Sequence, residues 1–302
     1  MDRRVVLQGV ASVAAATMLP ASGRAAEVSA SRRRIPSTGA EIPAVGIGSW
    51  ITFNVGSDPV LQDRSTGVIA AFLEEGGGVI DSSPMYGSSQ ATIGYALAQL
   101  DAAGKVFSAD KIWTSAADAP GQLAETGARW GTSRFDLLQV HNLIDWQANL
   151  ELLFALKEAG RLGHVGITTS HGRRHDELER IMASQPVDFV QLTYNLADRE
   201  AEARLLPLAR EKGIAVIVNR PFRRGSLIRG LDREPLPAMA AELGAGSWAQ
   251  VLLKFILGHP ATTCVIPATT QVDHVRENKS VVRGPLPDAA MRRELAAYFD
   301  DL

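Results

Sequence analysis

Eight short runs of apolar and β-branched residues, separated by helical patterns, constrain the fold of this 302-residue chain most strongly. Stretches between the runs, such as NLELLFALKEAGRLG, repeat their leucines at about the 3.6-residue spacing of a helix with one buried face. Strands that alternate with helices predict βαβ units and a parallel sheet. The predicted strands lie at 44–50, 78–83, 111–116, 136–142, 164–170, 189–195, 215–222 and 263–270.

Two architectures with parallel sheets compete, a doubly wound sheet and a (β/α)8 TIM barrel. A doubly wound dinucleotide fold would need a Gly-x-Gly-x-x-Gly turn after its first strand, and the chain has only GIGSW there. The count of eight strands and the lack of a linker after residue 40 favour a single (β/α)8 barrel over residues 41–302. The long connection 223–248 follows the seventh strand, so we expect it to lie over the active-site face.

The first 26 residues have the layout of a secretory leader with a twin arginine. Arg3 and Arg4 precede a short apolar run, and small residues follow it around Ala25. We expect the twin-arginine export machinery to carry the protein to the periplasm or outside the cell, with no membrane insertion of the mature form. Residues 27–40 would then be a flexible arm. The alternative is a disordered basic arm on a cytosolic protein.

Composition narrows the range of partners. The formal net charge is −2 and the sequence has no basic stripe, so we do not expect a polyanion such as nucleic acid as a partner. Cys264 is the only cysteine, so no intramolecular disulfide can form, and we expect a buried, inert thiol. No metal site is expected, because His164, His171, His175 and His259 show no paired metal-ligand spacing.

Four polar residues fall at the ends of consecutive predicted strands. Asp81 ends the second strand, Tyr86 lies in the loop beyond it, Lys111 begins or lies within the third, and His141 ends the fourth. Singly, each has an ordinary explanation, such as a turn-forming aspartate, a surface lysine or a core histidine. Because barrel strands converge at their C-terminal ends, we expect all four at one mouth.

These four residue types suit proton delivery. A tyrosine phenol titrates near pH 10 when unperturbed, so it needs help to act as an acid. A nearby ammonium lowers the tyrosine pKa, and a carboxylate holds that ammonium in place. A histidine can orient a carbonyl. Such a set can protonate an oxygen that is gaining negative charge.

Several segments resemble the aldo-keto reductase superfamily, among them IDSSPMYGSSQATIGYAL, DKIWTS, DLLQVHN, LKEAGRLGHVGIT and VIPATTQVDHVREN. The resemblance implies that Asp81, Tyr86, Lys111 and His141 form a catalytic tetrad with Tyr86 as proton donor. It also implies hydride transfer between NADP(H), or NAD(H), and small-molecule carbonyl compounds or alcohols.

The same resemblance implies a cofactor site. Thr168 and Thr169 replace the usual Ser-Asn pair beside the carboxamide, and Asn219 stands where a stacking tyrosine is common. Ala268 and His274 replace a common lysine and arginine near the 2′-phosphate, which leaves NADP and NAD both open. The expected cofactor residues are Ser49, Thr168, Thr169, Gln191, Arg220, Pro221, Phe222, Arg223, Thr269 and Asn278.

The resemblance also implies that Trp50 and Trp113 line the substrate pocket, and we expect Trp146 to add to it. An aromatic, largely apolar pocket suits hydrophobic aldehydes or ketones. One rival function remains open: a non-catalytic, nucleotide-binding barrel that senses redox state or binds a partner. The resemblance implies that such proteins can retain the tetrad, so the tetrad does not exclude this function.

Overall fold

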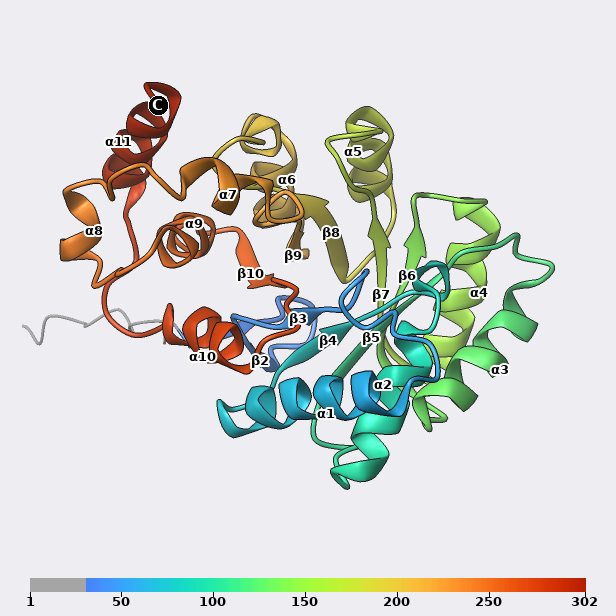
Figure 1. Cartoon of the computed structure of the whole chain (residues 1–302). Helices are drawn as coiled ribbons and strands as arrows, with labels where there is room; N and C mark the ends of the chain where they lie inside the picture. The colour runs from blue at the N-terminus through green and yellow to red at the C-terminus, as the bar shows by residue number, and fades with distance from the viewer. Residues whose placement is uncertain (1–30) are drawn as a thin grey trace, which may run out of the picture.

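The computed structural model describes residues 31–302, so the predicted leader of residues 1–26 lies outside the described residues. Eight parallel strands follow one another in sequence order around a barrel (Figure 1). An isolated bridge between Val45 and Val265, with the Gly46 amide donating to the Val265 carbonyl at 2.9 Å, closes the ring. The predicted TIM barrel is therefore confirmed. Its strands are β3 Ile47–Gly48, β4 Val79–Asp81, β5 Phe107–Ile112, β6 Phe135–His141, β7 Leu162–Thr168, β8 Phe189–Thr193, β9 Ala215–Asn219 and β10 Thr262–Val265.

Helices surround the strands on the outside. Two of them, α3 and α6, end where Gly131 and Gly213 take the left-handed conformation with φ near 68° and 67°, which glycine adopts at little cost. The main helices are α1 Pro59–Glu74, α2 Ser89–Gln99, α3 Ala119–Trp130, α4 Trp146–Glu158, α5 His175–Ser184, α6 Leu205–Lys212, α9 Trp248–Leu257, α10 Val272–Ser280 and α11 Ala289–Asp300. The connection after β9 holds α7 Ser226–Leu231 and α8 Met239–Glu242, and short turns of 3₁₀ helix lie at Pro84–Tyr86 (η1) and Glu200–Glu202 (η2).

The barrel interior is divided into an apolar lower layer and a polar upper layer. Side chains alternate along each strand, so Leu137 faces the lower interior and Gln139 and His141 face the upper interior. The lower layer is a compact cluster that includes the buried Cys264, whose pKa burial raises to about 12. This apolar layer supports a floor of polar groups at the carboxyl ends of the strands.

A hairpin closes the lower end of the barrel. β1 Arg32–Arg34 pairs antiparallel with β2 Glu41–Pro43, and Ile35 and Ile42 are buried in the lower interior cluster. Part of the segment that we expected to be a flexible arm is thus ordered in the structure. The physical reason is the burial of these two isoleucines, which a basic, proline-containing stretch does not make obvious.

The third predicted strand is displaced. We placed it at 111–116, whereas β5 runs from Phe107 to Ile112, so Lys111 lies near its end. Polar residues within β5 obscured its apolar pattern in the sequence. Ser108 bonds to Asp136 at 2.9 Å, and Asp110 accepts from the Trp130 indole at 2.6 Å, so both side chains are satisfied while buried.

Within residues 31–302, no helix is both long enough and apolar enough to cross a membrane.

Candidate active site

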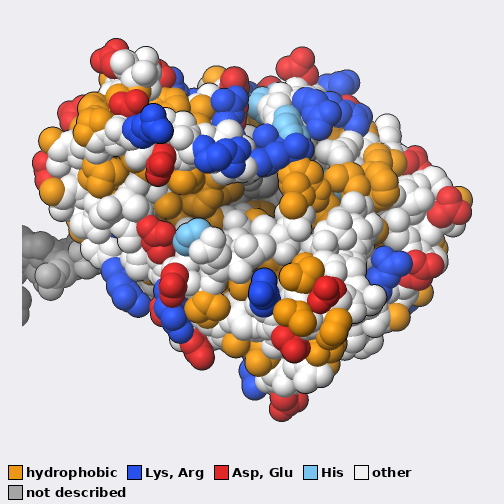
Figure 2. Space-filling model, in the orientation of Figure 1, with side chains coloured by type: hydrophobic (Ala, Val, Ile, Leu, Met, Phe, Trp, Pro, Cys, Tyr) orange, Lys and Arg blue, Asp and Glu red, His pale blue; other side chains and the backbone are white. Residues whose placement is uncertain are grey.

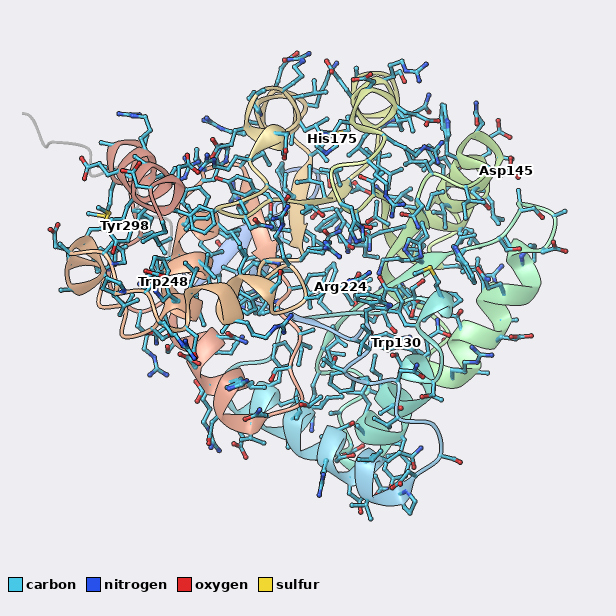
Figure 3. The ribbon with its side chains drawn as sticks, turned by 45° about the horizontal axis from the view of Figure 1, so that its top comes forward. Trp130, Asp145, His175, Arg224, Trp248 and Tyr298 are labelled. Carbon is cyan, nitrogen blue, oxygen red and sulfur yellow. The ribbon has the colours of Figure 1, made fainter. Side chains whose placement is uncertain are left out.

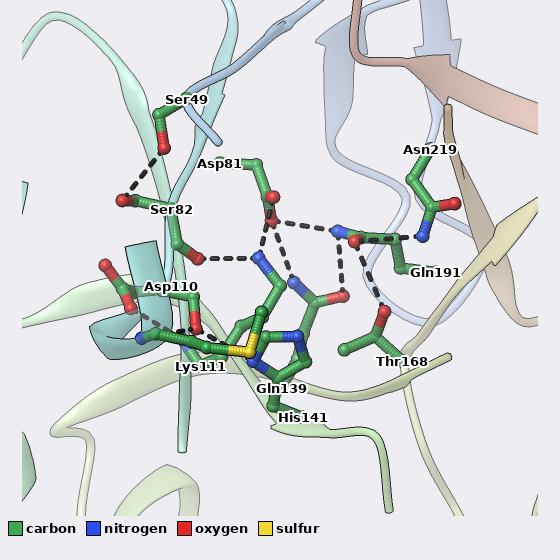
Figure 4. Close-up of polar contacts among 12 residues, drawn as sticks. Ser49, Asp81, Ser82, Asp110, Lys111, Gln139, His141, Thr168, Gln191 and Asn219 are labelled. Carbon is green, nitrogen blue, oxygen red and sulfur yellow. Dashed lines mark hydrogen bonds and ion pairs between the residues drawn. The ribbon is translucent and has the colours of Figure 1, made fainter. Parts of the chain in front are cut away.

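A buried ion pair lies at the centre of the upper interior (Figure 4). The Lys111 ammonium lies 2.7 Å from Asp81 Oδ2 and donates to the Ser82 carbonyl at 2.6 Å, and its side chain has no solvent exposure. Asp81 Oδ1 accepts from Gln191 at 2.8 Å and from Gln139 at 3.2 Å. Both charges are therefore compensated, as buried charges must be.

The charge state of Lys111 follows from that pairing. Burial disfavours the ammonium, but the negative charge of Asp81 and the hydrogen bond to Asp81 outweigh it, so the net effect is a raised Lys111 pKa. Lys111 is a permanent cation in this site at neutral pH.

Tyr86 stands over this cation. It ends the short helix η1, which Ser83 caps by accepting from the Met85 amide at 3.3 Å. Lys111 Nζ lies 5.0 Å from the centre of the Tyr86 ring. Gly87 follows with φ near 62°, and a Cβ there would come within 2.3 Å of the Asn54 side chain, so only glycine fits the turn into α2.

The pKa of Tyr86 differs from the sequence-based expectation. Burial raises the Tyr86 pKa, and the Lys111 charge lowers it only in part, so the net pKa lies above its usual value of 10. The phenol is therefore protonated at neutral pH and has a proton to donate. The role left to Lys111 is to stabilise the phenolate that forms when the proton leaves.

His141 completes the group as a neutral side chain. Its ring meets Tyr86 edge-on with centroids 5.8 Å apart, and burial together with the Lys111 charge lowers its pKa to about 3. Ser83 Oγ lies 2.8 Å from Nδ1 and already accepts from a backbone amide, so it can donate its proton to Nδ1. That tautomer leaves Nε2 protonated and able to donate to a carbonyl oxygen.

Sequence reasoning missed two residues that hold the tetrad: Gln139 supports Asp81, and Ser83 supports His141. Asn219, noted from the sequence only as a replacement for a stacking tyrosine, bonds to the Thr169 carbonyl at 2.9 Å. Gln139 had a usable signal, because it lies two residues before His141 on the same strand and must face the same interior. Ser83 lies beyond the end of β4, where strand alternation no longer predicts orientation.

The residues expected around a nicotinamide carboxamide do come together beside the tetrad. Thr168 Oγ1 donates to Gln191 Oε1 at 3.2 Å, and the Asn219 amide contacts the same oxygen at 3.3 Å. Gln191 thus links this floor directly to Asp81. Ser49 lies at the end of β3, where its hydroxyl donates to Ser82 at 2.9 Å.

The loop after β9 brings basic residues to the mouth. Arg223 forms a two-point ion pair with Asp198 at 2.7 and 2.8 Å, whereas Arg224 stacks 4.0 Å over the Trp50 ring. Arg220 Nε is buried without a hydrogen-bond partner in the described part of the chain. This guanidinium, which has an unused hydrogen-bond donor, fits a pyrophosphate group. Phe222 is half-buried and packs against the outer core, next to the buried Pro221.

The end of the site beyond β10 offers space for a nucleotide. A cavity of about 370 Å³ lies between the start of α1 and the loop after β10, away from the tetrad, and Thr269 and Arg64 line it. Within residues 31–302 Arg64 forms no ion pair, whereas Arg276 pairs with Glu74 at 3.6 Å. Asn278 is buried, and its amide makes no hydrogen bond to residues 31–302, which fits recognition of a base edge. Sequence reasoning missed Arg64, because α1 carries no motif.

The three predicted pocket tryptophans have different positions. Trp50 lies under Arg224, and Trp113 is 41% exposed on the loop after β5. Trp146 begins α4 and packs partly buried against the outer core. The mouth therefore has two tryptophans on the loops nearest Tyr86.

Comparisons with known proteins agree with this geometry. The sequence profile of the Aldo/keto reductase family matches residues 44–296, so the chain belongs to that family. The chain is 26% identical over 265 residues to the methylglyoxal reductase YeaE of Escherichia coli, covering 85% of this chain and 91% of that protein.

Solved structures share the fold. An aldo-keto reductase from Klebsiella pneumoniae in complex with NADPH superimposes with a TM-score of 0.75 at 21% identity, covering 89% of this chain and 95% of that one. The glycerol dehydrogenase AKR11B4 of Gluconobacter oxydans gives a TM-score of 0.75 at 19% identity, covering 89% and 94%.

Proposed function

We propose that this aldo/keto reductase is an NADP(H)-dependent oxidoreductase that interconverts aldehydes or ketones and alcohols, with Tyr86 as general acid. The observation that carries the proposal is the protonated Tyr86 phenol beside the fully buried Lys111–Asp81 pair. The similar proteins include a methylglyoxal reductase and an aldo-keto reductase solved in complex with NADPH, which agrees with this chemistry.

The residues divide the work as follows. A bound reduced nicotinamide supplies the hydride. His141, neutral because burial and Lys111 lower its pKa, donates a hydrogen bond from Nε2 that orients the substrate carbonyl. Tyr86 gives its proton to the oxygen as negative charge develops there, and the Lys111 ammonium stabilises the resulting phenolate. Asp81, held by Gln139 and Gln191, fixes Lys111.

The cofactor would lie across the barrel mouth. Thr168, Thr169, Gln191 and Asn219 form the floor that would hold the carboxamide, the β9 loop arginines would hold the pyrophosphate, and Asn278 would hold the adenine. Ala268 and His274 do not supply a cation for the 2′-phosphate of NADP, whereas Arg64 lines the cavity and forms no ion pair within residues 31–302, so it can bind that phosphate. This supports NADP over NAD.

We also propose export by the twin-arginine route, which rests on Arg3, Arg4 and the small residues around Ala25. That route carries folded proteins, so the cofactor can be bound before export. N-terminal sequencing of the native protein tests this: a mature start near residue 27 outside the cytoplasm supports export, and an intact start in the cytosol contradicts it.

The test of the catalytic proposal is Tyr86→Phe, which removes one hydroxyl and keeps the ring. We expect single-turnover oxidation of bound NADPH by 4-nitrobenzaldehyde to slow by roughly 10²–10⁴, while NADPH binding, followed by tryptophan fluorescence, persists. The matched control is Tyr95→Phe, whose exposed hydroxyl bonds to Asp63 on the barrel exterior. Wild-type rates in Tyr86→Phe would favour the binding-only barrel.

A further inference from the structure

Three arginines at the barrel mouth lack a carboxylate partner. Arg173 lies on the loop after β7, and Arg220 and Arg224 lie on the loop after β9; none forms an ion pair within residues 31–302. By contrast, the neighbouring Arg174 forms an ion pair with Glu177, and Arg223 forms one with Asp198. Figure 2 shows basic side chains gathered along one edge of the hollow, and Figure 3 places Arg224 over the middle of the barrel.

The three charges are close enough to oppose one another. Burial lowers the pKa of Arg220, and the charges of Arg224, Arg223 and Arg173 lower it further against the opposing charge of Asp198. Arg220 and Arg224 also hold φ near 54° and 60°, in the left-handed region that is unfavourable for non-glycine residues. Strained, mutually repelling cations at a mouth indicate a site for anions.

Arg173 belongs to a loop fixed beside the catalytic group. Arg174 on the same loop donates to the carbonyl of Asn142, the residue after His141. The amide of His171 donates to Thr193 Oγ1 at 3.0 Å, at the end of β8. These contacts hold the loop between His141 and the polar floor. Arg173 lies on this loop, where its Nε donates to the Ser170 carbonyl at 3.3 Å, and thus on a different loop from the β9 arginines.

The loops after β3, β4 and β5 form a contrasting apolar edge. Ile51, Met85 and Trp113 are 60%, 37% and 41% exposed, and Met85 adjoins Tyr86 in the chain. Exposed hydrophobic side chains beside a site are available to contact an apolar ligand. The mouth thus presents exposed apolar side chains near the proton donor together with arginines that lack a carboxylate partner.

We propose that the carbonyl substrate is an amphipathic anion, an aldehyde or ketone with an apolar body and a carboxylate that binds Arg173. This inference rests on the proposed function. The cofactor pyrophosphate is doubly charged, so Arg220 and Arg224 suffice to neutralise it, and Arg173 remains for the substrate. A guanidinium matches a carboxylate with two parallel hydrogen bonds.

Two para-substituted aldehydes test the proposal, the charged 4-carboxybenzaldehyde and the uncharged 4-methylbenzaldehyde, with saturating NADPH. We expect wild type to favour the carboxylate by about tenfold in kcat/KM, the size of a charged hydrogen-bonded contact. The preference should lie mainly in KM, because the contact is equal in ground and transition states. Arg173→Gln should bring the ratio close to one.

The matched control is Arg210→Gln, an exposed arginine near the end of α6 on the barrel exterior, which should keep the wild-type ratio. Equal reduction of both aldehydes by wild type, or an unchanged ratio in Arg173→Gln, overturns the inference and leaves the proposed function standing. A raised Kd for NADPH in Arg173→Gln assigns the residue to the cofactor and also overturns it. If wild type binds NADPH but reduces neither aldehyde, the proposed function fails and the inference fails with it.

Discussion

Replacing Lys111 with methionine separates the two roles of this side chain, which are charge compensation inside the barrel and stabilisation of the tyrosinate. Methionine keeps much of the lysine volume and no charge. The change leaves the Asp81 carboxylate buried and supported only by the amides of Gln139 and Gln191. Removing one partner of a buried ion pair typically lowers the free energy of unfolding by about 3–5 kcal/mol. Because two amide donors still support Asp81, we expect a value near the lower end, about 3 kcal/mol.

The catalytic effect follows from the distance to Tyr86. Lys111 Nζ lies 5.0 Å from the centre of the Tyr86 ring, and with this distance as the charge separation and an effective dielectric constant of about 20, a unit charge stabilises the phenolate by about 3 kcal/mol. Each 1.36 kcal/mol corresponds to about tenfold. Losing the cation should therefore slow proton donation by roughly a hundredfold or more.

Single-turnover oxidation of bound NADPH by 4-nitrobenzaldehyde, alongside chemical denaturation, measures both effects. The control is Lys157→Met, which breaks the Lys157–Asp188 pair, 2.6 Å long and outside the barrel interior. That variant should lose stability but keep its rate. The reasoning is refuted if Lys111→Met stays within threefold of wild type, or if both variants slow equally.

Two further predictions concern the cofactor and pH. Arg64→Gln should weaken NADPH binding by about tenfold and leave NADH binding nearly unchanged, because only NADPH carries the 2′-phosphate; equal weakening of both in fluorescence titrations would contradict this. Burial, with help from the Lys111 charge, lowers the pKa of His141 to about 3, and burial lowers the pKa of His259 to about 4. Both pKa values lie below the value of about 6.5 in the unfolded chain, so each histidine contributes stability that is present above pH 6.5 and lost on acidification. Asp110, with its pKa raised by burial to about 6, gains stability as pH falls and offsets only part of this loss. The free energy of unfolding should therefore fall by a net few kcal/mol between pH 7 and pH 4, and thermal denaturation should show a lower Tm at pH 4. A Tm that stays constant would show that the histidines are not buried in the neutral form.

The fold was predictable because its signals are repetitive. Eight apolar runs separated by helical patterns define the barrel, and an error in one strand does not change the count. The exceptions were segments whose burial depends on distant partners. The hairpin β1–β2 is stable because Ile35 and Ile42 cover the lower end of a barrel that forms from the rest of the chain.

The tetrad was predictable because each member ends a strand or follows one, and barrel topology brings those ends together. The residues that support it were less predictable. Asn219, at the end of β9, acts through contacts of its amide with the carbonyl of Thr169, the residue that follows β7, and with Gln191 in the neighbouring strand β8. The charge state of Tyr86 was also out of reach, because the balance between burial and the Lys111 charge depends on the three-dimensional environment.

The displaced strand β5 shows how the same polar residues that obscure a strand can serve the site. Asp110 and Lys111 are adjacent and point to opposite faces of the sheet. On the outer face, Asp110 accepts from the Trp130 indole at 2.6 Å, from Gln90 at 3.0 Å and from the Lys111 amide at 2.7 Å. On the inner face, the Lys111 ammonium is held by Asp81 and the Ser82 carbonyl. The backbone at Lys111 is thus fixed from α2 and α3 on one side and from the tetrad on the other. A cation that must stay about 5 Å from a reacting phenol benefits from such support, because its stabilising effect falls as the distance grows.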